Sequence, residues 1–158
     1  MKSNQQNLKA SILDRLVDNE PRISHEPVQY RLVNIGQIKA SVIRDLENLL
    51  NTKRQIVIPP AACKQVNRSL FVYGLPDFTS QNPASRSARQ HIRRDIEKTI
   101  ARFESRLKDV RVQVETLSQK DRSLKFRITA LLVVEPIAEP VSFDTYFDIG
   151  KREYVISE

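Results

Sequence analysis

The sequence has little of the residues on which several common kinds of site depend. Its 158 residues include one cysteine and two histidines, and glycine occurs only at positions 36, 74 and 150. With Cys63 alone, an internal disulfide and a multi-cysteine metal site are excluded. His25 and His91 lie far apart, and neither has metal-ligand spacing to another donor. The three scattered glycines also leave no Gly-rich phosphate loop.

Long hydrophobic runs are missing as well. The longest uncharged apolar stretch, Ile128 to Val134, is far shorter than the roughly 20 residues that a membrane-spanning helix needs. The first residues, Met1 to Gln6, are not followed by the apolar core of a secretion signal. We therefore expect a cytosolic protein with no direct membrane insertion.

The patterns of a catalytic site are also absent from the sequence. No nucleophile-elbow motif occurs, and no pair of carboxylates stands out as the acid and base of a glycoside hydrolase. Cys63 lies between Ala62 and Lys64, and a structural or incidental thiol is favoured over a nucleophile there. We expect a protein that is not an enzyme and that holds no cofactor or metal.

What the sequence does contain is an excess of positive charge in its middle. The 26 basic and 19 acidic residues give a net charge of +7, in an otherwise ordinary globular composition. Between Arg86 and Arg111, nine basic residues face four acidic ones, whereas Val112 to Glu158 holds six basic and eight acidic residues. Such a segment could bind nucleic acid, an anionic membrane or an acidic protein, and charge alone does not choose among them.

Apolar periodicity predicts helices in the first two thirds of the chain. Residues 8–18 and 37–51 repeat with a helical period, and so does the basic segment. The apolar stripe of the basic segment is formed by Ala88, Ile92, Ile96, Ile100 and Phe103. Prolines interrupt the chain between these helices, and Tyr73 to Phe78 is typical of a fixed turn.

After the basic helix the period changes to two. Strands are predicted over 110–114, 124–134, 141–147 and 153–157, and their short connections favour an antiparallel meander. We expect a single α+β domain over residues 1–158, with the helices on one face of the sheet. Residues 1–7 are expected to be disordered, 8–103 to form the mainly helical part and 108–157 the sheet.

A charged pair lies where the basic helix should meet the sheet. Phe103 and Leu107 would anchor this corner in the core, so that Glu104 and Arg106 project from it. One interpretation is a surface ion pair that contributes about 0–1 kcal/mol. The other is a docking point, where deletion of a desolvated arginine costs about 3–5 kcal/mol. Composition alone favours the surface pair.

Four phrases in order resemble the TssE family, the baseplate wedge proteins of bacterial type VI secretion systems. This family belongs to the phage baseplate wedge proteins historically labelled lysozyme-like. The resemblance extends from about residue 11 to 150 and rests on residues 11–16 (SILDRL), 41–54 (SVIRDLENLLNTKR), 73–78 (YGLPDF) and 100–107 (IARFESRL). The family carries a Glu-Pro-Arg motif where this chain has Glu104, Ser105 and Arg106, so the two charges are kept and the proline is replaced. A literal Glu-Pro-Arg at residues 20–22 follows the first helix, and we regard it as a coincidence.

The resemblance implies a structural subunit that links other baseplate wedge subunits and nucleates the contractile sheath. It implies a cytoplasmic baseplate docked at the inner face of the membrane, and a sheet that incoming sheath strands can extend. An edge strand with unpaired backbone groups is suited to such addition. Glu104 and Arg106 are the expected partner-binding residues, and the basic helix face of Arg89, Arg93 and Arg94 is a second candidate, for which plain solvation is an equal alternative.

Two other functions stay open from the sequence. The basic helix of residues 86–111 could bind nucleic acid, although its one aromatic residue, Phe103, falls on the apolar stripe. Glycoside hydrolysis through Glu104 has no support beyond the historical family label. We expect baseplate and sheath proteins as partners, and no nucleic acid.

Overall fold

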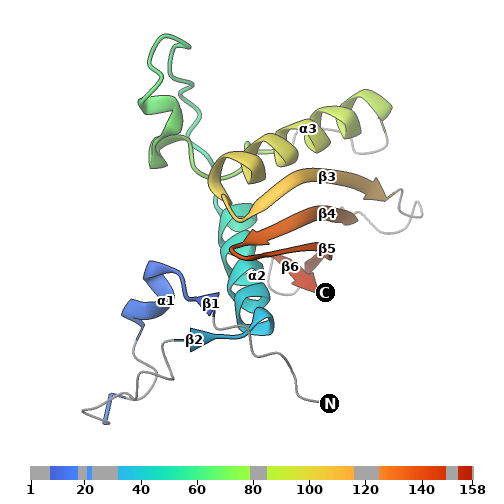
Figure 1. The fold of residues 1–158 in the computed structure, drawn as a ribbon. Coiled ribbons are helices and arrows are strands. Elements are labelled where there is room, and N and C mark those ends of the chain that lie inside the picture. Colours follow the sequence, from blue (N-terminus) through green and yellow to red (C-terminus); the bar gives the residue numbers. More distant parts are fainter. Residues whose placement is uncertain are drawn as a thin grey trace. The chain divides into compact units, whose positions relative to one another are not determined.

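The computed structural model describes residues 8–17, 21–22, 32–78, 85–115, 125–148 and 153–157. Its internal contacts divide the chain into two compact units, Met1–Arg44 and Asp45–Glu158, and each unit is considered by itself. Figure 1 shows the order of the elements along the chain. The expected disorder of residues 1–7 lies outside the described residues.

The first unit holds a small two-stranded sheet and a short helix. Strand β1 (Leu8–Lys9) pairs antiparallel with β2 (Leu32–Val33), and α1 (Ile12–Leu16) follows β1. The helix predicted over 8–18 is therefore shorter than expected. The physical reason is a cap, because the Ser11 hydroxyl accepts a hydrogen bond from the Asp14 backbone N–H at 3.2 Å and so fixes the helix start after the strand.

Helix α2 (Ile35–Asn51) begins in the first unit and ends in the second. Asn34 and Gln37 form a reciprocal cap at its start. The Gln37 N–H donates to Asn34 Oδ1 at 2.8 Å, and the Asn34 N–H donates to Gln37 Oε1 at 2.9 Å. Within the second unit, the last turns of α2 bury Leu46, Leu49 and Leu50, as the apolar stripe predicts. None of the described helices is both long and apolar enough to cross a lipid bilayer.

The segment after α2 contains two 3-10 turns, η2 (Val66–Arg68) and η3 (Leu70–Val72). Its two ends are joined by backbone hydrogen bonds of 2.8 Å, from Leu75 N–H to the Thr52 carbonyl and from Arg54 N–H to the Leu75 carbonyl. The predicted turn at Tyr73 lies at this junction. Gly74 there has a φ of +96°, in the region that side chains disfavour.

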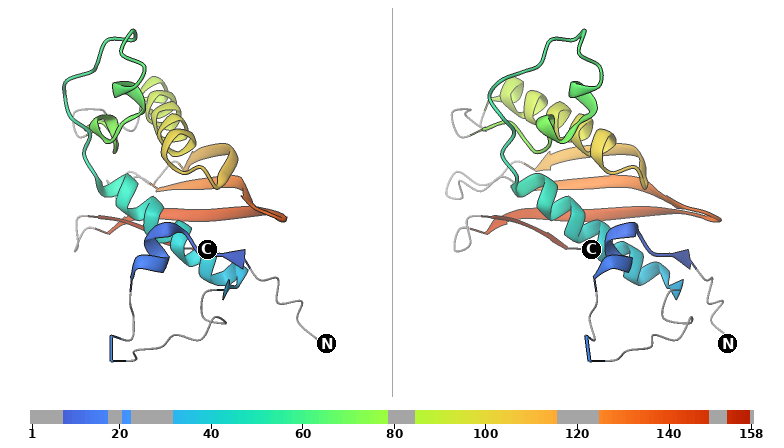
Figure 2. Two further views of the ribbon diagram at one scale, coloured as in Figure 1. Left: turned by 60° about the vertical axis from the view of Figure 1, so that its left-hand side comes forward. Right: turned by 90° about the vertical axis from the view of Figure 1, so that its left-hand side faces the viewer.

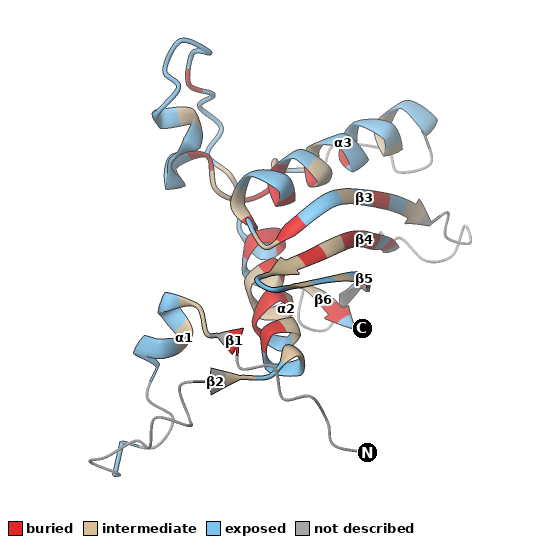
Figure 3. Ribbon diagram, viewed as in Figure 1, coloured by how far each residue is buried: buried red, intermediate tan, exposed pale blue. Residues whose placement is uncertain are grey.

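Helix α3 (Arg86–Phe103) and the four-stranded sheet make up the core of the second unit. The strands β3 (Leu107–Glu115), β4 (Lys125–Val134), β5 (Ile137–Asp148) and β6 (Glu153–Ser157) pair antiparallel in chain order. The predicted α+β class and antiparallel meander are confirmed. Figure 2 shows α3 lying beside β3, and Figure 3 shows buried residues on both α3 and the sheet. The buried side chains of this core include Ile92, Ile96, Ile100, Val112, Phe126, Ile128, Leu132, Val141 and Phe143.

Replacement of Gly74 by alanine should destabilise the second unit. A Cβ at this position would lie 2.3 Å from the Thr52 carbonyl oxygen, and the φ of +96° would be strained. We expect the free energy of unfolding to fall by about 1–3 kcal/mol in urea denaturation. Gly36→Ala is the control, since its nearest neighbour would be the Asn34 Oδ1 at 3.3 Å. Equal losses in both variants would contradict the assignment of strain to Gly74.

The titration of Asp14 should report the contacts of α1. Burial by itself would raise the pKa of Asp14, but hydrogen bonds from Ser11, Arg44 and Ser41 and the charge of Arg44 outweigh it, so the pKa lies below the ordinary 3.8. This group therefore contributes stability above pH 3.8 that is lost as the pH falls through the lowered pKa. We expect carboxyl-carbon NMR to give a midpoint below 3.8, and Ser11→Ala to raise it. An unchanged midpoint in that variant would show that the Ser11 hydrogen bond does not lower the pKa of Asp14.

Candidate functional site

The corner between α3 and β3 is fixed by backbone hydrogen bonds on both sides. Glu104 ends the helix, and its N–H donates to the Ile100 carbonyl at 2.8 Å. Its own carbonyl accepts from Leu107 N–H at 3.2 Å, and the Arg106 carbonyl accepts from Val133 N–H of β4 at 2.8 Å. Ser105, at the position where the resemblance leads us to expect a proline, is exposed. The corner is thus held without the proline, because helix, turn and sheet all bond to it.

The Arg106 guanidinium binds two carboxylates at this corner. Its Nε donates to Glu104 Oε1 at 2.8 Å and its Nη2 to Glu104 Oε2 at 2.6 Å, which is the two-pronged geometry that favours arginine. The same Nη2 lies 2.6 Å from Asp45 Oδ2 on the last turns of α2. We call Asp45, Glu104 and Arg106 the Arg106 cluster. It ties the end of α3 and the start of β3 to α2.

The Arg106 cluster is mostly withdrawn from solvent. The side chains of Glu104, Arg106 and Asp45 keep 8%, 20% and 29% of their surface exposed. The interpretation as a surface ion pair is therefore wrong, and the two side chains turn toward each other and toward α2 instead of projecting outward. Burial alone would lower the pKa of Arg106, but the hydrogen bonds and charges of Glu104 and Asp45 raise it above its ordinary value, so the group stays charged.

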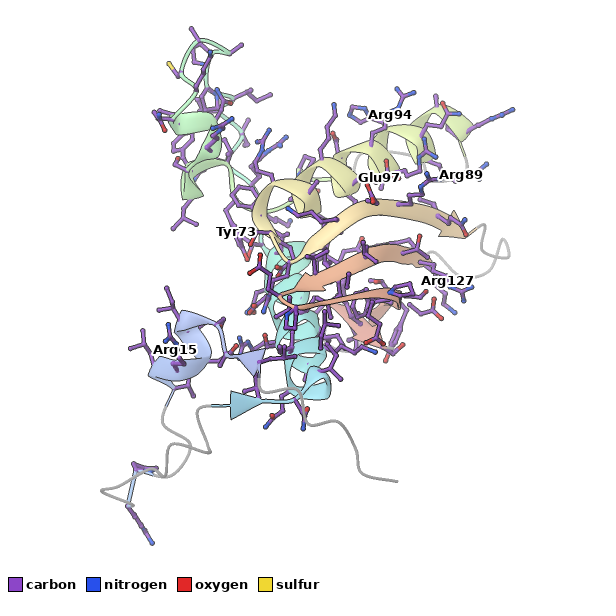
Figure 4. All side chains as sticks on the ribbon, in the orientation of Figure 1. Arg15, Tyr73, Arg89, Arg94, Glu97 and Arg127 are labelled. Carbon is purple, nitrogen blue, oxygen red and sulfur yellow. The ribbon has the colours of Figure 1, made fainter. Side chains whose placement is uncertain are left out.

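An aromatic pair adjoins the cluster. Tyr73 packs edge-on against Phe103, with their ring centroids 5.1 Å apart. The pKa of Tyr73 is raised, first by burial and then by the negative charges of Asp45 and Glu104. The turn at Tyr73, labelled in Figure 4, therefore supports the same corner. Three of the sequence segments that carry the family resemblance, residues 41–54, 73–78 and 100–107, therefore meet at or beside this cluster.

Asp45 is the member that sequence reasoning missed. It precedes Arg106 by 61 residues and stands beside the apolar stripe of α2, where a polar residue is typical of a solvent-facing position. No local pattern links the two residues.

The three arginines expected to form a basic face do not share one surface with the cluster. Arg93 and Arg94 are exposed, and Arg89 is half-buried. Arg89 and Arg93 lie four residues apart on one side of α3, whereas Arg94 lies about 100° further round the helix. Figure 4 shows Arg94 pointing away from the sheet and Arg89 on the side of β3. The end of α3 lies about 15 Å from Arg93 along the helix axis.

The outer edge of β6 is occupied by side chains of α2. The Tyr154 N–H donates to Asn51 Oδ1 at 2.7 Å, and Asn51 Nδ2 donates to the Tyr154 carbonyl at 2.9 Å. The Ile156 N–H donates to Glu47 Oε1 at 3.0 Å. The carboxamide of Asn51 thus makes both bonds that the peptide group of a neighbouring strand would make. The outward N–H groups of Tyr154 and Ile156 are therefore already bonded by side chains of α2.

The outer edge of β3 is occupied at one point. The Val112 N–H donates to Glu97 Oε1 of α3 at 2.9 Å, next to a register shift between Lys108 and Arg111. Glu97 lies on the β3 side of α3 in Figure 4. Because alternate residues of a strand face the same way, the Val114 N–H points outward like that of Val112. Within the described part of the chain, no side chain bonds to the Val114 N–H.

Of the remaining candidates from the sequence, Cys63 and His91 fall within the described residues. Cys63 is an exposed free thiol. His91 lies 3.3 Å from Asp95 on the same helix, and His25 is outside the described residues. Among the residues that the structure describes, no three His, Cys, Asp or Glu side chains gather as metal ligands would.

Comparison with known proteins identifies the family. Residues 36–137, which run from α2 to the start of β5, match the family described as baseplate wedge protein gp25. The chain belongs to this family. The predicted resemblance to baseplate wedge proteins is confirmed, and the family is a structural component of the baseplate.

A solved structure has the same fold. A chain of "The baseplate complex from the type VI secretion system" superposes with a TM-score of 0.51, at 18% sequence identity. The match covers 70% of this chain and 94% of the other. No curated protein is significantly similar in sequence. At 18% identity the structural similarity establishes the fold. The assignment to a baseplate family rests on the family match.

Removal of the Arg106 side chain should destabilise the protein. Arg106→Ala would remove the guanidinium that binds two carboxylates, one of them in Glu104, which is only 6% exposed. We expect the free energy of unfolding to fall by about 3 kcal/mol. The matched control is Arg127→Ala, which breaks an exposed cross-strand pair with Asp144 and should cost less than about 1 kcal/mol. Urea denaturation of both variants measures the two changes in the free energy of unfolding. Similar decreases in both variants would contradict the structural role of the Arg106 cluster.

Proposed function

We propose that this protein is a non-enzymatic wedge subunit of a type VI secretion baseplate, which links core baseplate subunits and nucleates the contractile sheath. The observation that carries the proposal is the family match over residues 36–137. That range includes the Arg106 cluster and the two strands that follow it. The likeness in fold to a chain of a type VI baseplate complex supports the same assignment. The proposed place of action is the cytoplasmic side of the membrane on which the baseplate docks.

The proposed contact with core subunits is centred on the corner at Ser105. The Arg106 cluster gives this corner a fixed shape, and Arg106 keeps 20% of its side chain at the surface. A preorganised surface loses less entropy on binding than a mobile one. In this proposal Glu104 acts by holding Arg106 in place, and Arg106 meets the partner. The exposed cations Arg93 and Arg94, with the half-buried Arg89, form a second, separate contact.

The proposed contact with the sheath is strand addition at β3. Side chains of α2 take the outward N–H groups of Tyr154 and Ile156 on β6, which leaves little for an added strand. Among the described outward N–H groups of β3, that of Val112 is engaged by Glu97 and that of Val114 is bonded by no described side chain, which favours this edge. Each added backbone hydrogen bond would contribute about 0.5–1.5 kcal/mol. An incoming strand that pairs as far as Val112 would displace Glu97.

The test is co-purification of baseplate and sheath subunits with a tagged chain, compared between Val114→Pro and Val114→Ala. Proline removes the outward N–H and leaves the bonds between β3 and β4, since the Val114 N–H does not take part in them. Alanine removes the side chain and keeps the N–H. We expect Val114→Pro to recover about tenfold less sheath protein while baseplate subunits are retained, and Val114→Ala to behave like the wild type.

Three results would contradict parts of this proposal. Full sheath recovery with a folded Val114→Pro variant would exclude β3 as the accepting edge. Recovery of the wild-type chain without any baseplate subunit would overturn the wedge assignment. Co-purification of nucleic acid that is released by about 0.1 M salt, and lost in Arg93→Glu/Arg94→Glu, would favour nucleic-acid binding by α3 instead.

A further inference from the structure

Between α2 and α3 the chain forms a projecting arm, which we define as residues 54–72. Figure 1 and both views of Figure 2 show this arm, drawn in green, extending away from the sheet of the second unit. Its base is closed by the hydrogen bonds between Thr52, Arg54 and Leu75. The exposed apolar side chains of the arm lie outside the core of the second unit and do not contribute to it.

The arm exposes large apolar side chains to an unusual degree. Ile56, Ile58 and Leu70 are 96%, 75% and 80% exposed. The other exposed apolar residues of the arm are Val57, Val66 and Phe71. Single exposed apolar residues are normal on a protein surface, but a cluster of six within one projection is typical of a binding surface.

The arm is held in one shape by its own contacts. Asn67 Nδ2 donates to the Pro60 carbonyl at 2.9 Å and to the Cys63 carbonyl at 3.0 Å. The Ser69 hydroxyl caps the turn that carries Leu70. Two consecutive prolines, Pro59 and Pro60, restrict the backbone beside Ile58. A rigid apolar surface of this kind can bind with a small loss of entropy.

The charge of the arm is of one sign. No acidic residue occurs between Glu47 and Asp77, whereas the arm carries Arg54, Lys64 and Arg68. None of these three cations forms an ion pair within the described residues. Lys53, at the base, pairs with Asp77 at 3.5 Å. The surface that covers the arm is therefore expected to supply the carboxylates.

We propose that the arm docks into an apolar cleft, rimmed by Asp and Glu side chains, on another protein subunit of the baseplate. This inference rests on the proposed function for the identity of the assembly. A protein partner is favoured over an anionic membrane for two reasons. The tip has neither the Trp nor the Tyr that membrane interfaces favour, and its shape is fixed in advance by proline and side-chain hydrogen bonds. The apolar residues enter the cleft, and the cations bind its rim.

The only cysteine of the chain, Cys63, is exposed on the arm and provides a native attachment point for the test. A benzophenone maleimide attached to Cys63 is photo-activated in the assembled baseplate, and the cross-linked peptides are identified by mass spectrometry. We expect one baseplate subunit, cross-linked beside a segment that combines acidic and apolar residues. Ile56→Asp/Ile58→Asp should lower the cross-link yield about 30-fold, the effect of a residue that dominates an interface. The control, Ala138→Asp, adds a charge at an exposed position outside the arm and should change nothing.

The outcomes separate this inference from the function on which it rests. Recovery of the baseplate without a cross-link from Cys63, or with full yield in the double variant, would overturn the docking arm alone. Binding of the isolated chain to vesicles of phosphatidylcholine and phosphatidylglycerol, lost in the double variant, would assign the arm to a membrane and also overturn it. Recovery of no baseplate subunit with the wild type would overturn the proposed function and the arm together.

Discussion

Two carboxylates share the guanidinium of Arg106, and this shared charge fixes how α2, α3 and β3 meet. Apolar packing stabilises the contact between these elements but does not fix their orientation. The free energy gained by burying Ile96 or Leu46 depends on the apolar area removed from water and not on the angle of contact. The hydrogen bonds from Arg106 to Glu104 and Asp45 add the direction, because each requires a particular geometry. The turn at Gly74 and the ring pair of Tyr73 and Phe103 then close around the same corner.

The regular parts of the fold could be predicted because they depend on local periodicity. The stripe of Ile92, Ile96 and Ile100 gave α3, and the alternation after Leu107 gave a four-stranded meander in the correct order. The first helix was predicted too long, because a cap at Ser11 outweighs the apolar spacing that continues through Leu8. A strand of two residues, such as β1, is too short to show the alternation of apolar and polar residues by which a strand is predicted.

The contacts within the Arg106 cluster could be predicted only in part, for a physical reason. Glu104 and Arg106 stand two residues apart, so their pairing is readable, but Asp45 reaches them only after the chain has folded. The same is true of Glu47, Asn51 and Glu97, which are polar residues of helices and resemble solvent-facing positions in the sequence. Their bonds to β6 and β3 are made to backbone groups, and a backbone partner leaves no mark on the residue types of the strand.

The carboxamide of Asn51 has a consequence for the symmetry of the sheet. By bonding to both the N–H and the carbonyl of Tyr154, one side chain stands in for a peptide group and ends the sheet at β6. The β6 edge is bonded at Tyr154 and Ile156, whereas the β3 edge is bonded at Val112. The two edges of the sheet are therefore different. Asn51, the last residue of α2, thus makes the two edges of the sheet unequal as hydrogen-bonding surfaces.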